Sequence, residues 1–192
     1  MLTVAVRTSL LSAALLGASA LRWGAEREPP PPPAPEHAFP VTWTGTWSGD
    51  LLVVRGDDTL QRTGMRLAIA PLDGGRYSWA LGYGEPGADE RPYVLSPDTT
   101  ASGRWRIDER NGVVLDASLH AGVLYSRFAV MGELLLTRDE LRGDTLHHEI
   151  VSGRLAPVAT GDVVVAGDTI PPVGSYPVDT RQFARLTRVG ED

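Results

Sequence analysis

The sequence contains no cysteine and no lysine. Without cysteine the chain cannot form disulfides, thiolate metal sites, a cysteine nucleophile or a lipid-modified N-terminal cysteine. All 18 basic residues are therefore arginines, and they are scattered singly along a chain of net charge −6. Binding to nucleic acid requires a basic stripe or patch, so this distribution argues against nucleic acid as a partner.

Familiar catalytic and metal-binding patterns are also missing. There is no Gly-x-Ser-x-Gly, no phosphate loop and no dinucleotide-binding fingerprint. His147 and His148 are neighbours on one expected strand and point to opposite faces, so the two rings cannot chelate the same metal. Only His37 and His120 remain, which makes a three-histidine zinc site improbable. These absences favour a protein that is not an enzyme and holds no metal.

The N-terminal segment is typical of an exported protein. Residues 1–20 contain Arg7, an apolar stretch and an Ala-x-Ala cleavage site, which together predict a signal peptide. The apolar run of roughly a dozen residues is shorter than the ~20 that span a bilayer, so no stable membrane insertion is expected after cleavage. Residues 21–38 are proline-rich and predict a stiff linker. We expect a secreted or periplasmic protein with one folded domain at residues 39–192; the abundance of arginine, alanine, glycine and proline indicates a bacterial source.

Residues 103–130 contain the clearest folding signal. A three-residue loop at Arg110-Asn111-Gly112 and a two-residue loop at Ala121-Gly122 place every apolar side chain of this stretch on one face. The predicted cross-strand pairs are Trp105 with Ala117, Ile107 with Leu115, Leu119 with Leu124 and Ala117 with Ser126. On the other face the same registers place Arg106, Asp116 and Arg127 in one row of alternating charge. The stretch therefore predicts an antiparallel meander.

Alternating patterns elsewhere predict further short strands. They cover residues 43–54, 65–69, 77–83, 93–95, 134–141, 145–151 and 182–189, with loops at 55–63 and 84–92 and an irregular segment at 154–180. In the 134–141 strand, Leu134 and Leu136 are expected to continue the buried face, and one or two turns of helix are the alternative for this segment. Because every assignable connection is a local hairpin, the pattern predicts an all-β, antiparallel up-and-down barrel of about 8–10 strands. A β-sandwich is the alternative.

Gly45-Thr46-Trp47 opens the first strand of this predicted barrel. This resembles the Gly-x-Trp opening of the lipocalin and fatty-acid-binding proteins, the calycin superfamily. The resemblance implies a small barrel with an apolar cavity that is open at one end. It also implies that Trp47 packs at the closed end beneath an arginine of a late strand, here Arg185 or Arg188.

Candidate pocket residues come from the expected inner face of the barrel. They are Trp47, Trp79, Tyr83, Trp105, Phe128 and His148, and their alternative role is to fill a solid core. Tyr77, Tyr83 and Arg91 are candidates for the mouth. His148 lies between Leu146 and Ile150, two positions away on either side, so it is expected to face inward with Ser126 and Arg138. It could bind the polar head of a ligand, ligate haem iron, or serve as a hydrogen-bonded core residue.

Three functions are compatible with this sequence. The leading hypothesis is a lipocalin-like barrel that binds a small hydrophobic molecule without catalysis and has no cofactor. The alternative is a solid envelope domain that acts by binding an unidentified protein. The third is a barrel-type isomerase or cyclase, or a haem-binding barrel, and both depend on His148.

Overall fold

The structure is a computed structural model that describes residues 39–160, 163–165 and 168–190. The predicted signal peptide and proline-rich linker lie outside the described residues. Two short 3-10 helices are present, at Val41–Trp43 and Asp73–Gly75. The strands that form the barrel are β1 (Gly45–Arg55), β2 (Asp58–Pro71), β3 (Tyr77–Tyr83), β4 (Asp89–Pro97), β5 (Arg104–Asp108), β6 (Val114–His120), β7 (Val123–Val130), β8 (Glu133–Arg142), β9 (Thr145–Arg154) and β14 (Thr180–Arg188). No helix among the described residues is long and apolar enough to cross a membrane.

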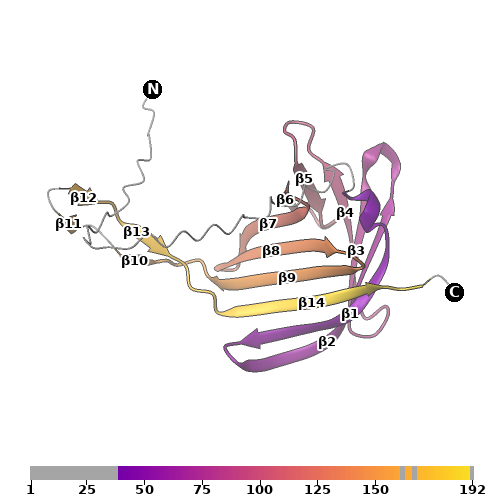
Figure 1. Cartoon of the computed structure of the whole chain (residues 1–192), viewed down its shortest axis with the longest axis horizontal. Coiled ribbons are helices and arrows are strands. Elements are labelled where there is room, and N and C mark those ends of the chain that lie inside the picture. Colours follow the sequence, from indigo (N-terminus) through magenta and orange to yellow (C-terminus); the bar gives the residue numbers. More distant parts are fainter. Residues whose placement is uncertain (1–38, 161–162, 166–167, 191–192) are drawn as a thin grey trace, which may run out of the picture. The chain divides into compact units, whose positions relative to one another are not determined.

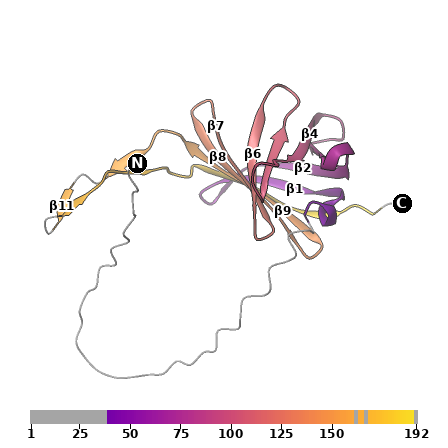
Figure 2. The same ribbon diagram turned by 90° about the horizontal axis from the view of Figure 1, so that it is seen from above.

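These ten strands close into a single antiparallel barrel. From β1 to β9 each strand pairs with the next one along the chain, and β14 pairs with both β9 and β1. Figure 1 shows β8, β9, β14 and β1 running side by side, and Figure 2 shows the same barrel from above. The prediction of an up-and-down barrel is therefore confirmed, and the sandwich alternative is wrong.

Glycine-containing turns fix the strand registers, as the sequence predicts. Trp105 pairs with Ala117 and Leu119 pairs with Leu124. Gly112 has a φ of 97°, and Gly122 has a φ of 80°. An L-residue adopts such positive values only at a cost, which is why glycine marks both turns. The loop at residues 73–75 likewise fixes a register, in which Ile69 pairs with Trp79, Leu67 with Leu81 and Met65 with Tyr83.

Two segments expected to be loops are in fact strands. β2 already begins at Asp58, so only Gly56 and Asp57 separate it from β1. β4 begins at Asp89, which shortens the expected 84–92 loop. Both segments lie where inward positions carry polar side chains, such as Gln61 and Arg91, so the alternation of apolar and polar residues that marks a strand is absent.

The register of β8 differs from the expected one by one residue. Met131 and Gly132 form a two-residue turn that pairs Val130 with Glu133. As a result Leu135 faces inward and Leu136 faces outward, where it is 37% exposed. A slip of one residue exchanges the two faces of a strand, so the outward and inward side chains of β8 are reversed relative to the expectation.

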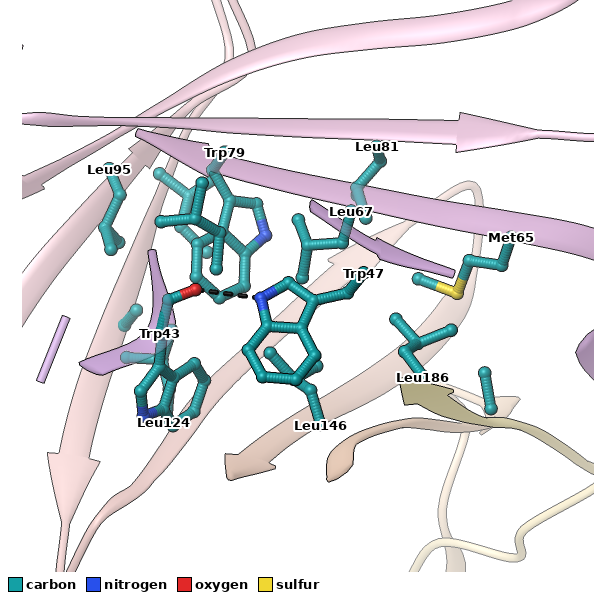
Figure 3. Packing of buried hydrophobic residues seen from close by; sticks show 14 of the residues in the cluster. Trp43, Trp47, Met65, Leu67, Trp79, Leu81, Leu95, Leu124, Leu146 and Leu186 are labelled. Atoms are coloured by element: carbon teal, nitrogen blue, oxygen red, sulfur yellow. Dashed lines mark hydrogen bonds between the residues drawn. The ribbon is translucent and has the colours of Figure 1, made fainter. Parts of the chain in front are cut away.

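The two ends of the barrel differ in composition. At one end, here called the closed end, β1 and β5 begin and the 3-10 helix at Val41–Trp43 precedes β1. Figure 3 shows the buried residues packed at this end, with the Trp47 indole nitrogen hydrogen-bonded to the Trp43 carbonyl. At the other end, here called the open end, β1 ends at Arg55, β9 ends at Arg154 and β14 begins at Thr180.

The segment between β9 and β14, expected to be irregular, contains four strands of three residues each. β10 (Val158–Thr160) pairs with β13 (Val173–Ser175), and β11 (Val163–Val165) pairs with β12 (Asp168–Ile170). The segment leaves and rejoins the barrel at the open end. At this point the amide of Asp179 donates a hydrogen bond to the carbonyl of Ser152.

Candidate functional site

The closed end of the barrel is filled by aromatic and aliphatic side chains. Trp47 and Trp79 are 1% and 3% exposed, and both belong to the buried core. Trp105 packs against the same core, where the ring of Phe39 meets it edge-on at a centroid distance of 5.1 Å. Three of the six candidate pocket residues therefore lie where the interior is packed with protein side chains.

An arginine covers Trp47 from the last strand. The guanidinium carbon of Arg188 lies 4.2 Å from the centroid of the Trp47 ring. The same guanidinium donates hydrogen bonds to the carbonyls of Thr44 and Thr42, the second at 3.1 Å. Of the two candidates suggested by the calycin resemblance, Arg188 is the one over the tryptophan, while Arg185 is exposed and pairs with His147 on the outer face.

The other three candidates lie on the inner face farther toward the open end, although Tyr83 still packs against the core. Tyr83 is the last residue of β3 and Phe128 lies in the second half of β7, both toward the open end. His148 lies deeper, two residues from the fully buried Leu146. Tyr83 and Phe128 are half-buried, whereas His148 is buried.

His148 forms a buried pair with a residue that the sequence patterns did not indicate. Its Nδ1 atom lies 2.7 Å from Oδ1 of Asp139, and both residues are 5% exposed. The register explains the contact, because Asp139 of β8 stands directly opposite His148 of β9. The Nε2 atom of His148 is buried without a hydrogen-bond partner among the described residues. An unsatisfied polar atom of this kind typically costs about 1–3 kcal/mol.

Asp139 was missed because of the one-residue shift in β8. The expected register turned Arg138 inward, whereas Arg138 faces outward and forms an ion pair with Glu140. The signal that could have revealed Asp139 is the Met131-Gly132 dipeptide, which has the same Xaa-Gly form as the Ala121-Gly122 turn. Ser126 does face inward as predicted, but its hydroxyl donates to the carbonyl of Asp116 at 2.7 Å and is thus already engaged.

Polar side chains also line the opposite wall of the barrel. In the order of strands, β3 stands across the barrel from β8. Burial raises the pKa of the Tyr83 hydroxyl to about 12; the positive charge of Arg91 opposes this shift, and the negative charge of Asp139 adds to it. The guanidinium of Arg91 lies 4.8 Å from the Tyr83 ring and forms a 2.9 Å ion pair with Asp89. Tyr83 and Arg91 thus lie at the open end as predicted, whereas Tyr77 pairs with Leu95 at the closed end and is not a mouth residue.

A pocket of about 630 Å³ lies at the open end. It is lined by Arg55, Glu133, Ser152, Arg154, Asp179 and Thr180. The hydroxyls of Ser152 and Thr180 lie 2.6 Å apart, and both residues occupy inward positions of paired strands. This mouth pocket is lined by polar and charged residues of both signs, and its volume falls within the roughly 300–1,000 Å³ of known small-molecule sites.

The Asp139–His148 pair contributes hydrogen-bonding groups to the interior of the barrel. No group of three or more histidine, aspartate or glutamate side chains within residues 39–160, 163–165 and 168–190 could hold a metal ion. In the Asp139–His148 pair, the carboxylate engages Nδ1, and Nε2 is buried without a hydrogen-bond partner among the described residues. A hydrogen bond to one ring nitrogen fixes the orientation of a histidine and the protonation of its other nitrogen.

Comparisons with known proteins agree with this architecture. No model of a protein family and no curated protein matches the sequence. Among solved structures, a protein of unknown function from the DUF3598 family of Nostoc punctiforme superposes with a TM-score of 0.52 at 16% identity, over 82% of this chain and 50% of that one. This chain therefore spans half the length of the Nostoc protein.

Two further solved structures have a weaker likeness. The S-type phycobiliprotein lyase CPES of Guillardia theta gives a TM-score of 0.49 at 10% identity, over 78% of this chain and 89% of that one. The fluorescent protein UnaG gives 0.42 at 16% identity, over 78% and 98%. The closed ten-strand meander, the Gly-x-Trp opening and the arginine over its tryptophan together show that this chain has the lipocalin-like fold of the calycin barrels.

Proposed function

We propose that this protein binds a small, mainly apolar molecule in the open half of its barrel and carries it without catalysis. The observation that carries this proposal is the 630 Å³ mouth pocket at the end of a closed barrel. Below the polar lining of the pocket, apolar side chains occupy inward positions of the open half and are only half-buried. They are Val53, Leu115, Phe128, Leu135 and Ile150.

The distribution of polarity indicates how such a ligand would lie. Inward apolar side chains of the open half can cover its apolar body, because burial of apolar surface contributes roughly 25 cal/mol per Å². Arg55, Arg154, Glu133 and Asp179 at the mouth pocket can interact with a polar end that remains near solvent. The ligand class is therefore amphipathic, with most of its surface apolar.

Two neighbouring leucines of β8 that face opposite ways provide a direct test of this function. Leu135 faces into the open half and Leu136, its neighbour, faces outward. We expect Leu135→Arg to weaken binding of the apolar fluorescent probe N-phenyl-1-naphthylamine at least about tenfold, because the variant places a charge on the apolar wall. Leu136→Arg should bind the probe as the original chain does. Equal binding by both variants, or no binding by the original chain, would overturn the proposal and favour a solid interaction domain.

We also propose that the protein acts after export, as a secreted or periplasmic carrier. The support is the signal-like sequence of residues 1–20. Expression of the full chain in a bacterium, followed by intact-mass measurement of the periplasmic fraction, tests it. A mass that corresponds to cleavage after Ala20 is expected. Retention of the full-length mass in the cytoplasm would contradict export.

A further inference from the structure

The Asp139–His148 pair is a polar element set in an apolar part of the barrel. The inward neighbour of His148 on β14 is Ala184, and the inward neighbour of Asp139 on β7 is Leu124, both buried. Apolar side chains at positions 139 and 148 would suit such surroundings. The pair instead leaves Nε2 of His148 without a hydrogen-bond partner within residues 39–160, 163–165 and 168–190, and an unsatisfied buried nitrogen lowers stability. A cost of this kind points to a function.

The hydrogen bond between Asp139 and His148 determines which ring nitrogen of the neutral histidine carries the proton. A carboxylate oxygen can only accept, so the Nδ1 atom of His148 is the donor to Asp139. In the neutral imidazole the proton then resides on Nδ1, and Nε2 carries a lone pair. In this neutral form, His148 holds a hydrogen-bond acceptor in a fixed direction on the inner face of the barrel.

We propose that the Asp139–His148 pair is the polar anchor of the bound molecule, and that this molecule donates an O–H or N–H group to Nε2 of His148. This inference rests on the proposed function and adds the chemical class of the ligand: a mainly apolar molecule with a hydrogen-bond donor on the end that enters the barrel first. Asp139 acts as a positioning residue because it fixes the tautomer of the histidine.

The position of the pair suits this role. Along β9 the inward residues from the mouth are Ser152, Ile150 and His148, so at the usual rise of a strand the Cα of His148 lies about 13 Å along β9 from that of Ser152, which lines the mouth pocket. Nε2 is shielded from solvent, so a ligand must displace the side chains that cover it. Tyr83, on the strand across the barrel from β8, keeps a protonated hydroxyl at neutral pH.

A matched pair of probes separates this inference from the proposed function. 2-Naphthol carries an O–H donor, and 2-methoxynaphthalene has nearly the same shape without it. We expect the full chain to bind 2-naphthol about tenfold more tightly, as one buried hydrogen bond implies. Equal affinities would overturn the anchor and leave the proposed function standing, whereas binding of neither probe would overturn both.

Three variants then test whether the preference for 2-naphthol over 2-methoxynaphthalene depends on His148 and Asp139. His148→Phe removes the acceptor and should reduce the ratio of the two affinities to about one while 2-methoxynaphthalene still binds. Asp139→Asn keeps the shape of the side chain, but its amide N–H can donate to Nδ1 and move the ring proton to Nε2, so the ratio should also fall. His147→Phe, on the outer face of the same strand, should leave the ratio unchanged. A tenfold preference that persists in both His148→Phe and Asp139→Asn would overturn the inference.

Discussion

At the closed end of the barrel Trp47 is 1% exposed and lies beneath Arg188, whereas toward the open end the inward side chains Phe128 and Leu135 are only half-buried. The same ten strands form both ends. One end is packed with aromatic rings, and the other keeps a 630 Å³ pocket with charged residues. Under the proposed function, the closed end supplies stability and the open half supplies binding.

The largest expected effect separates the two ends directly. Trp47→Ala should lower the free energy of unfolding by about 3–5 kcal/mol, the usual cost of removing a buried aromatic side chain. Phe128→Ala, a comparable truncation on the half-buried open side, should cost about 1–2 kcal/mol. Urea unfolding of the full chain followed by far-UV circular dichroism measures both. Equal losses would mean that the open half contributes to stability as much as the closed end.

Substitutions at Asp139 and His148 test whether this buried polar pair serves binding at the expense of stability. Asp139→Ala leaves a second buried nitrogen of His148 unpaired and should cost about 1–3 kcal/mol. Replacing both partners by apolar residues, in Asp139→Leu/His148→Phe, should recover most of that loss because no polar group is then stranded. The same urea titration provides the measurement. A double variant as unstable as Asp139→Ala would show that the pair stabilises the fold.

Arg188 provides a smaller test at the closed end. Arg188→Ala removes the cation–π contact with Trp47 and the hydrogen bonds to the carbonyls of Thr44 and Thr42, and should cost about 1–2 kcal/mol. Arg185→Ala is the matched control, since Arg185 is exposed on the outer face of the same strand. It should change stability by less than about 0.5 kcal/mol. Similar losses in the two variants would count against the contact with Trp47.

The contrast between the two ends also explains what the sequence could predict. Glycine turns such as Arg110-Asn111-Gly112 and Ala121-Gly122 fix registers locally, so the meander and the barrel follow from short stretches of chain. At the closed end, inward positions are apolar and alternation identifies the strands. At the open end, inward Gln61 and Arg91 break the alternation, and the strand segments around them resemble loops.

The site was only partly predictable for the same physical reason. His148 lies between apolar residues on a clear strand, so its inward direction was evident from the sequence. Asp139 lies in a strand with four apolar side chains, Leu134, Leu135, Leu136 and Leu141, in which composition alone does not decide the register. Only the turn at Met131-Gly132 decides it, and that turn brings Asp139 rather than Arg138 to face inward.

The smallest expected effect on the free energy of unfolding comes from Tyr83 and appears only at alkaline pH. Its pKa of about 12 in the folded protein exceeds the value near 10 of an unfolded chain, chiefly because of burial. Between these values the unfolded state releases the proton first, so stability is full below pH 10 and falls as the pH rises toward 12.

From pH 8 to pH 11 the original chain should therefore lose about 1 kcal/mol more than Tyr83→Phe, as measured by urea unfolding at each pH. Tyr176→Phe, at a side chain that is 48% exposed, controls for the loss of a hydroxyl in general and should behave like the original chain. Identical losses in the original chain and in Tyr83→Phe would mean that water reaches Tyr83 freely. The open region would then extend along the wall opposite Asp139, and the boundary between packed core and binding half would lie deeper in the barrel.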